Sequence, residues 1–184
     1  MRRRPDMPDL MVRGFVRDTG AVAAVEFAIV LPFMLVLYLG SLEFGNATAV
    51  QFKTAMATRT VADLTSQYIL IDNTTMSGIL NAASTVVAPY SGSSMIVTVT
   101  QITTNASGQG TIAWSDSLNG TPRTVGQSVT LPTALQIANT TMIWSEVTYP
   151  YRSTFGYALT GTINISQSNF FYPRLSTTIT RTNS

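Results

Sequence analysis

Two carboxylates are the residues of this sequence that could act as a catalytic pair. Asp116 and Glu146 are the acids of the stretch that we expect to form a β-sheet, and paired carboxylates are what a glycoside hydrolase uses. Their spacing and flanking residues give no reason for the two to meet, so we expect each to be solvated or bound to one base. The chain has no cysteine and no histidine, which excludes thiolate and imidazole metal sites and Ser-His-Asp triads. We therefore expect no enzyme activity, no cofactor and no metal.

The basic residues are concentrated at the N-terminus. The sequence pI is about 9.2, yet from residue 71 onward four arginines face three acids. Binding to nucleic acid depends on clustered Lys and Arg against phosphates, so we expect no nucleic-acid partner. The basic residues before position 20 are Arg2, Arg3, Arg4, Arg13 and Arg17.

An apolar run at residues 21–42 follows this basic segment and contains a single charge, Glu26. As a helix of 22 residues it would be about 33 Å long, close to the thickness of a bilayer's hydrocarbon core. Asp18 or Thr19 could cap its start. Arginine-rich flanks remain in the cytoplasm. We predict one membrane span, a cytoplasmic N-terminus and an exported C-terminal domain.

A cleaved secretory signal is the alternative interpretation of this segment. Ala47-Thr48-Ala49 matches an A-x-A cleavage site, which would release a secreted soluble protein starting at Val50. Residues 27–42 form an uninterrupted apolar run of 16 residues, longer than the usual core of about 7–15 residues. The length therefore favours a retained span.

Two residues inside the run are unusual for a simple anchor. Pro32 removes one backbone hydrogen bond and can kink the helix. Glu26 lies close enough to the end of the span to reach the headgroups. A second interpretation is that Glu26 meets a positive charge on a neighbouring chain within an assembly.

The order of motifs resembles a known family. Gly20-Ala-Val-Ala-Ala-Val-Glu26-Phe27, then Ala28-Ile-Val-Leu31-Pro32, then Leu42-Glu43-Phe44-Gly45, is similar to the N-terminal signature of TadE-like proteins. These are pilin-like proteins of bacterial tight-adherence (Flp-type) pilus systems. Weaker similarity lies at residues 146–151 and 171–176.

The resemblance implies a location, partners and a role for named residues. It implies an inner-membrane minor pilin, pseudopilin or assembly factor with a periplasmic domain, which acts with other pilin-like subunits and the pilus machinery. Some such proteins are cut by a prepilin peptidase after a glycine. Glutamate at position five of the mature chain then pairs with a neighbour's new N-terminal amine. Here that residue would be Glu26, with Phe27 and Pro32 as further assembly positions and Glu43 as a possible interface residue.

The spacing leaves the processing site open between Gly20 and Ala21. Glu26 is the sixth residue after Gly20 and the fifth after Ala21. Cleavage after Gly20 has the expected glycine before the cut but puts Glu26 at position six of the mature chain. Cleavage after Ala21 puts Glu26 at position five but has alanine before the cut. Cleavage after either residue and no cleavage at all are the three alternatives.

The rest of the chain predicts an α+β domain. We expect the first helix to continue past Gly45 as an amphipathic helix, and a second helix from Asp72 or Asn73 to about Ala88, stopped by Pro89. Alternating β-branched residues indicate antiparallel strands. The predicted segments are a strand at 95–102, a returning strand at 111–114, a short helix at 132–139, a strand at 142–151, a loop at 154–169 and a weak strand at 175–180.

Four aromatic residues near the C-terminus are the best candidates for an interface. Aromatic side chains bury much area and retain a polar handle, which suits both interfaces and strand cores. The four are Tyr149, Tyr151, Phe171 and Tyr172. The predicted organisation is a cytoplasmic segment at 1–20, a transmembrane helix at 21–45 and an exported periplasmic domain at 46–184. A membrane-anchored periplasmic binding or scaffold protein outside any filament is the alternative function.

Overall fold

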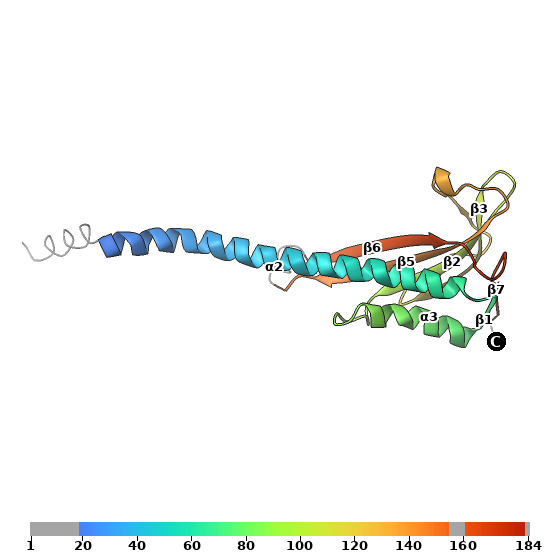
Figure 1. Ribbon diagram of the computed structural model, residues 1–184, viewed down its shortest axis with the longest axis horizontal. Helices are drawn as coiled ribbons and strands as arrows, with labels where there is room; N and C mark the ends of the chain where they lie inside the picture. Colours follow the sequence, from blue (N-terminus) through green and yellow to red (C-terminus); the bar gives the residue numbers. More distant parts are fainter. Residues whose placement is uncertain (1–18, 155–160, 183–184) are drawn as a thin grey trace, which may run out of the picture. The chain divides into compact units, whose positions relative to one another are not determined.

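The computed structural model describes residues 19–154 and 161–182 (Figure 1). Contacts divide the chain into two units with the boundary after Gly45, and each is described by itself. The predicted basic segment lies almost wholly outside the described residues. In chain order the elements are α2 (Thr19–Ser66), β1 (Leu70–Ile71), α3 (Asn73–Val86), β2 (Ile96–Thr104), β3 (Gly110–Leu118), β4 (Ser128–Val129), the 3-10 helix η1 (Thr133–Leu135), β5 (Thr141–Arg152), β6 (Thr162–Phe171) and β7 (Thr180–Arg181).

The α+β fold class is confirmed. One long apolar helix leads into a domain, hereafter the body (residues 46–182), in which a five-stranded antiparallel sheet has the order β4-β3-β2-β5-β6. The second strand pair is a short parallel one between β1 and β7. The second half of α2 and helix α3 lie along the same face of the large sheet in Figure 1.

The second half of α2 carries a buried stripe at three- and four-residue spacing, as its sequence predicts. Val50, Ala57 and Val61 are fully buried. Thr54, Thr58 and Thr65 of the stripe are also buried. Each hydroxyl donates a hydrogen bond to the backbone carbonyl four residues earlier: Thr54 to Val50, Thr58 to Thr54 and Thr65 to Val61. Back-bonding removes the cost of burying these hydroxyls, so the helix can pack closely on the body.

Helix α3 begins where the sequence predicts it. The Asp72 carboxylate accepts a hydrogen bond from the Thr75 backbone N–H at 2.7 Å, which satisfies one of the free donors of the first turn. This hydrogen bond is the main reason that the pKa of Asp72 lies below its usual value. The helix buries one apolar face, formed by Met76, Ile79, Leu80 and Ala83.

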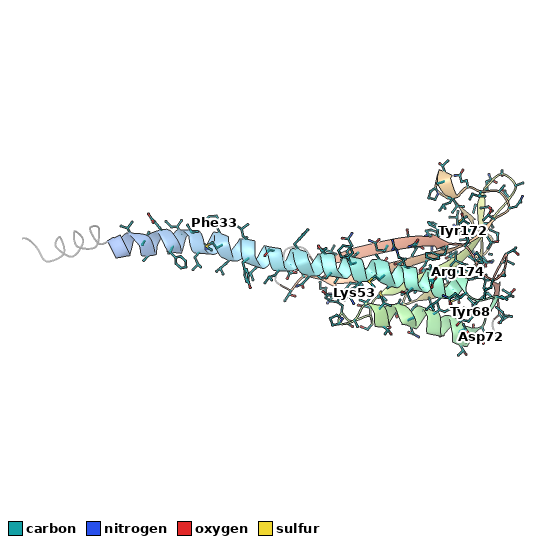
Figure 2. All side chains as sticks on the ribbon, viewed as in Figure 1. Phe33, Lys53, Tyr68, Asp72, Tyr172 and Arg174 are labelled. Carbon is teal, nitrogen blue, oxygen red and sulfur yellow. The ribbon has the colours of Figure 1, made fainter. Side chains whose placement is uncertain are left out.

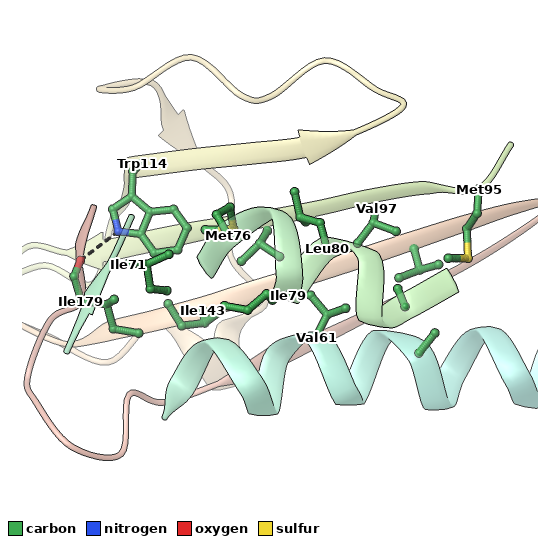
Figure 3. Close-up of a cluster of buried hydrophobic side chains, with 14 of the residues drawn as sticks. Val61, Ile71, Met76, Ile79, Leu80, Met95, Val97, Trp114, Ile143 and Ile179 are labelled. Carbon is green, nitrogen blue, oxygen red and sulfur yellow. Dashed lines mark hydrogen bonds between the residues drawn. The ribbon is translucent and has the colours of Figure 1, made fainter. Parts of the chain in front are cut away.

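The main core lies between the helices and one face of the sheet (Figure 3). The Trp114 indole N–H donates to the Ile179 carbonyl at 2.9 Å, so the C-terminal segment is held against β3. Gln101 is also buried and reaches the same segment, accepting from Ile179 N–H at 2.8 Å and donating to the Thr178 hydroxyl at 2.9 Å. The cluster comprises Ala57, Val61, Ile71, Met76, Ile79, Leu80, Ala83, Val87, Met95, Val97, Val99, Trp114, Ile143, Val147 and Ile179.

A smaller cluster covers part of the opposite face of the sheet. Ile102, Leu131 and Met142 are buried together, and Leu131 comes from the long connection between β3 and β5. Arg123 of the same connection lies over the Trp144 ring, 3.8 Å from its centroid, and Trp144 stacks on Phe170. The connection between β3 and β5 therefore packs on the sheet.

Three predictions for the C-terminal half need correction. The loop expected at 154–169 is wrong from residue 162 onward, because β6 pairs with β5 over ten residues, while residues 155–160 lie outside the described part. Strand β6 is rich in Asn, Ser and Gln, which are poor signals for a strand, and pairing with β5 overrides that composition. The short helix expected at 132–139 is reduced to η1, and the strand expected at 175–180 is only β7.

Candidate functional site

The first half of α2 presents apolar side chains to the exterior on every side. Phe33 and Leu37 are 68% and 74% exposed, and Figure 2 shows Phe33 standing out from the helix. Among the described residues this is the one helix long and apolar enough to cross a membrane. Its large exposed side chains are Val22, Val25, Phe27, Ile29, Val30, Leu31, Phe33, Met34, Leu35, Val36, Leu37, Tyr38, Leu42 and Phe44.

Glu26 is an isolated carboxylate on this apolar surface. It is exposed, and its neighbours one turn away are Val22, Ile29 and Val30. Among the described residues no basic side chain forms an ion pair with it. In lipid or between packed helices an ionised carboxylate without a partner is costly.

Pro32 lies within α2, which continues through it. Proline has no N–H to donate, so the carbonyl of Ala28 lacks the hydrogen bond that this turn would normally provide. The residue therefore leaves a polar backbone group within the apolar half of the helix.

The two possible processing positions lie in the first turn of α2, which begins at Thr19. Gly20 and Ala21 are both helical there. Glu43, further along α2, is half-buried and takes part in a polar or electrostatic interaction.

Asp116 and Glu146 lie on opposite faces of the sheet. Asp116 aligns with Val99 and Glu146 aligns with Thr98, and successive residues of a strand point to opposite faces. Asp116 accepts two hydrogen bonds of 2.9 Å from Arg181, and Glu146 is paired with Arg123. The expectation that each acid binds one base is confirmed, and the two cannot act on one substrate.

The aromatic interface candidates occupy different environments. Tyr151 is 7% exposed and Tyr149 is half-buried against the main core, whereas Tyr172 is 47% exposed and Phe171 is half-buried. Burial and the neighbouring Tyr90 phenol raise the pKa of Tyr149 above its usual value. Tyr172 lies near the Arg174–Asp63 ion pair, which joins the segment after β6 to α2.

A groove lined in part by Tyr149 and Tyr151 was not predicted from the sequence. Its wall combines three segments that are distant along the chain: the start of the body in α2, the loop after α3 and the end of β5. The sequence holds no single motif for it. The lining residues are Asn46, Tyr90, Ser91, Ser94, Tyr149, Pro150, Tyr151, Arg152 and Thr154.

Within the described residues no group of acids could hold a metal ion.

Comparison with known proteins supports the pattern read in the N-terminal helix. Comparisons with curated proteins and with solved structures gave no significant match. Residues 21–63 match the sequence model described as TadE-like protein, which confirms the resemblance seen in the motifs and indicates a role in tight-adherence pilus assembly.

Proposed function

We propose that this chain is a membrane-anchored, pilin-like subunit or assembly factor of a tight-adherence pilus. One observation carries the proposal: within the TadE-like match at residues 21–63, the first half of α2 exposes apolar side chains all round, whereas the second half is packed into the body. Such a surface requires lipid or other apolar helices around it. The inner membrane first, and neighbouring pilin-like helices later, would meet that requirement, with the body exported to the periplasm.

Glu26 has an assembly role in this proposal. When the apolar helix leaves lipid and packs among similar helices, a lone carboxylate is tolerated if a cation pairs with it. A new N-terminal amine on a neighbouring subunit has the right charge. Pairing with Glu26 would set how far one helix slides along the next.

Pro32 has a separate role, which is to make the helix pliable near its centre. The carbonyl of Ala28 lacks its usual donor, so local bending or opening at this turn costs less than elsewhere in the helix. We propose that this helps the helix leave the bilayer for a protein environment. Pro32→Ala should slow or reduce pilus assembly, and an unchanged pilus yield would remove this role.

The first test is the N-terminus and intact mass of the protein from cells with and without a prepilin peptidase. We expect a start at Ala21 or Val22 that depends on the peptidase. An intact N-terminus would move the function to an assembly factor that stays in the membrane, as a scaffold outside the filament. A start at Val50 would make it a secreted soluble protein and end the proposal.

The second test replaces Glu26 with alanine and uses Gln51→Ala, at an exposed polar residue of the same helix, as the control. We expect Glu26→Ala to insert in the membrane normally but to reduce pilus yield at least about tenfold, the effect of losing roughly 1.4 kcal/mol at a step that limits assembly. Normal piliation by Glu26→Ala would contradict the pairing role. An equal loss in both variants would mean that Glu26 has no special position.

A further inference from the structure

The groove of about 590 Å³ is lined by residues near the start of the body. Asn46 on its wall is the first residue after the unit boundary. Asn46 belongs to α2 and follows Leu42, the last residue of the apolar run, by four residues.

Helix geometry gives the depth at which this end of the groove would lie in a bilayer. The apolar run ends at Leu42, and four further residues at 1.5 Å each put Asn46 about 6 Å beyond it. The polar layer on each side of a bilayer is roughly 5–7 Å thick, since the core is about 30 Å and the whole is about 40–45 Å. If Leu42 marks the edge of the hydrocarbon, Asn46 is among the lipid headgroups.

The lining of the groove suits that layer chemically. Tyrosine is enriched at the boundary between membrane and water, because its ring is apolar and its hydroxyl is polar. Tyr90 and Tyr149 are half-buried in the wall, and the Tyr149 hydroxyl can donate a hydrogen bond. Arg152 is exposed on the rim, and the described lining includes no acid.

We propose that this groove rests in the headgroup layer and holds the phosphate of a phospholipid. Arg152 binds the phosphate through its guanidinium, which forms paired hydrogen bonds to such oxygens. The hydroxyls of Ser91, Ser94 and Tyr149 supply further donors around it. The inference rests on the proposed function in one respect, which is that the first half of α2 spans a bilayer.

Spin labels on single cysteines test the depth directly in the full chain reconstituted in phosphatidylglycerol-containing vesicles. The native chain has no cysteine, so each introduced one is a unique site. Leu37→Cys reports on the apolar run, Ser94→Cys on the groove, and Ala106→Cys on the exposed turn at the opposite end of β2. Depth follows from the accessibility of each label to oxygen and to a water-soluble nickel chelate.

We expect the Leu37 label deep in the hydrocarbon, the Ser94 label close to the phosphates and the Ala106 label in water. A Leu37 label in water would mean that the anchor, and so the proposed function, is wrong. A deep Leu37 label with a Ser94 label as exposed to water as Ala106 would overturn only the headgroup inference.

The role of Arg152 is tested by counting phosphatidylglycerol molecules retained by the detergent-released protein in native mass spectrometry. We expect Arg152→Gln to lose one retained lipid and Arg59→Gln, a control at an exposed arginine of α2, to retain it. Equal retention by the two variants would overturn the assignment of the phosphate to Arg152. Displacement of the lipid by millimolar inorganic phosphate alone would make the groove a general anion site and overturn the lipid assignment.

Discussion

The two halves of α2 share one backbone conformation and differ in what their side chains contact. Between Val22 and Phe44 large apolar side chains are exposed, whereas from Val50 to Ser66 the buried stripe packs into the main core. A helix that is apolar all round needs an apolar surrounding, and one with a single stripe needs only its own domain. The second half of the helix therefore serves the fold, whereas the function that we propose for the first half is to contact lipid or other helices.

The largest expected effects come from placing the same charge in each half. Val61→Asp buries an unpaired carboxylate in the core and should lower the free energy of unfolding by more than about 4 kcal/mol. Val30→Asp should leave the unfolding of the body unchanged but disfavour membrane insertion by about 3 kcal/mol. Near-UV circular dichroism of the detergent-solubilised protein reports the first effect, and extraction from membranes by carbonate reports the second.

Met56→Asp is the control within the second half, because Met56 is exposed on the same stretch of helix. It should change neither stability nor insertion appreciably. If Val61→Asp were no more harmful than Met56→Asp, the division of the helix into two functional halves would be wrong.

A second prediction concerns the hydrogen bond that holds the C-terminal segment to the core. Trp114→Phe removes the indole donor to the Ile179 carbonyl and should cost about 1–2 kcal/mol beyond the loss of ring area. Trp144→Phe is the matched control, since the Trp144 N–H is buried without a partner among the described residues. Urea unfolding of both variants measures the difference, and a larger loss for Trp144→Phe would refute it.

A third prediction uses the cap of α3 and its dependence on pH. The folded pKa of Asp72 is lowered, so its ionised form stabilises the native state above the unfolded pKa of about 3.9. That contribution is lost as the pH falls through the lower folded pKa. Asp72→Ala should therefore lower the melting temperature of the body at neutral pH, and this deficit should shrink as the pH falls through the folded pKa.

Asp72→Asn separates the charge from the cap. Asparagine keeps an oxygen that can accept from Thr75 but does not titrate. Its melting temperature should lie between those of the native protein and Asp72→Ala at neutral pH. An Asp72→Ala deficit that persisted unchanged in acid would show that the carboxylate's charge has no part in the cap.

The smallest expected effect is at Ser145 in the sheet. Its hydroxyl is buried and has no hydrogen-bond partner among the described residues, so the native state gains nothing from it. Ser145→Ala should be neutral or stabilise the body by up to about 1 kcal/mol. A clear loss of stability in chemical unfolding would mean that the hydroxyl is bonded, to water for instance.

The first helix, a cap at Asp72 or Asn73, the strand after Met95 and the β-rich second part all followed from the sequence alone. These features depend on local signals: the length of an apolar run, side chains that cap a free N–H, and the period of apolar residues. The resemblance at Glu26 and Pro32 was likewise visible, because the motif is contiguous.

Only the tertiary structure decided which residues lie together. The polar composition of β6 hid a strand whose stability comes from its pairing with β5. Asp116 and Glu146 were separated by strand register, since one residue of offset moves a side chain to the other face. The groove lined by Tyr90, Tyr149 and Tyr151 is formed by three segments that are distant along the chain. Pairing, register and clefts depend on contacts between segments far apart in the chain, and no local pattern specifies those contacts.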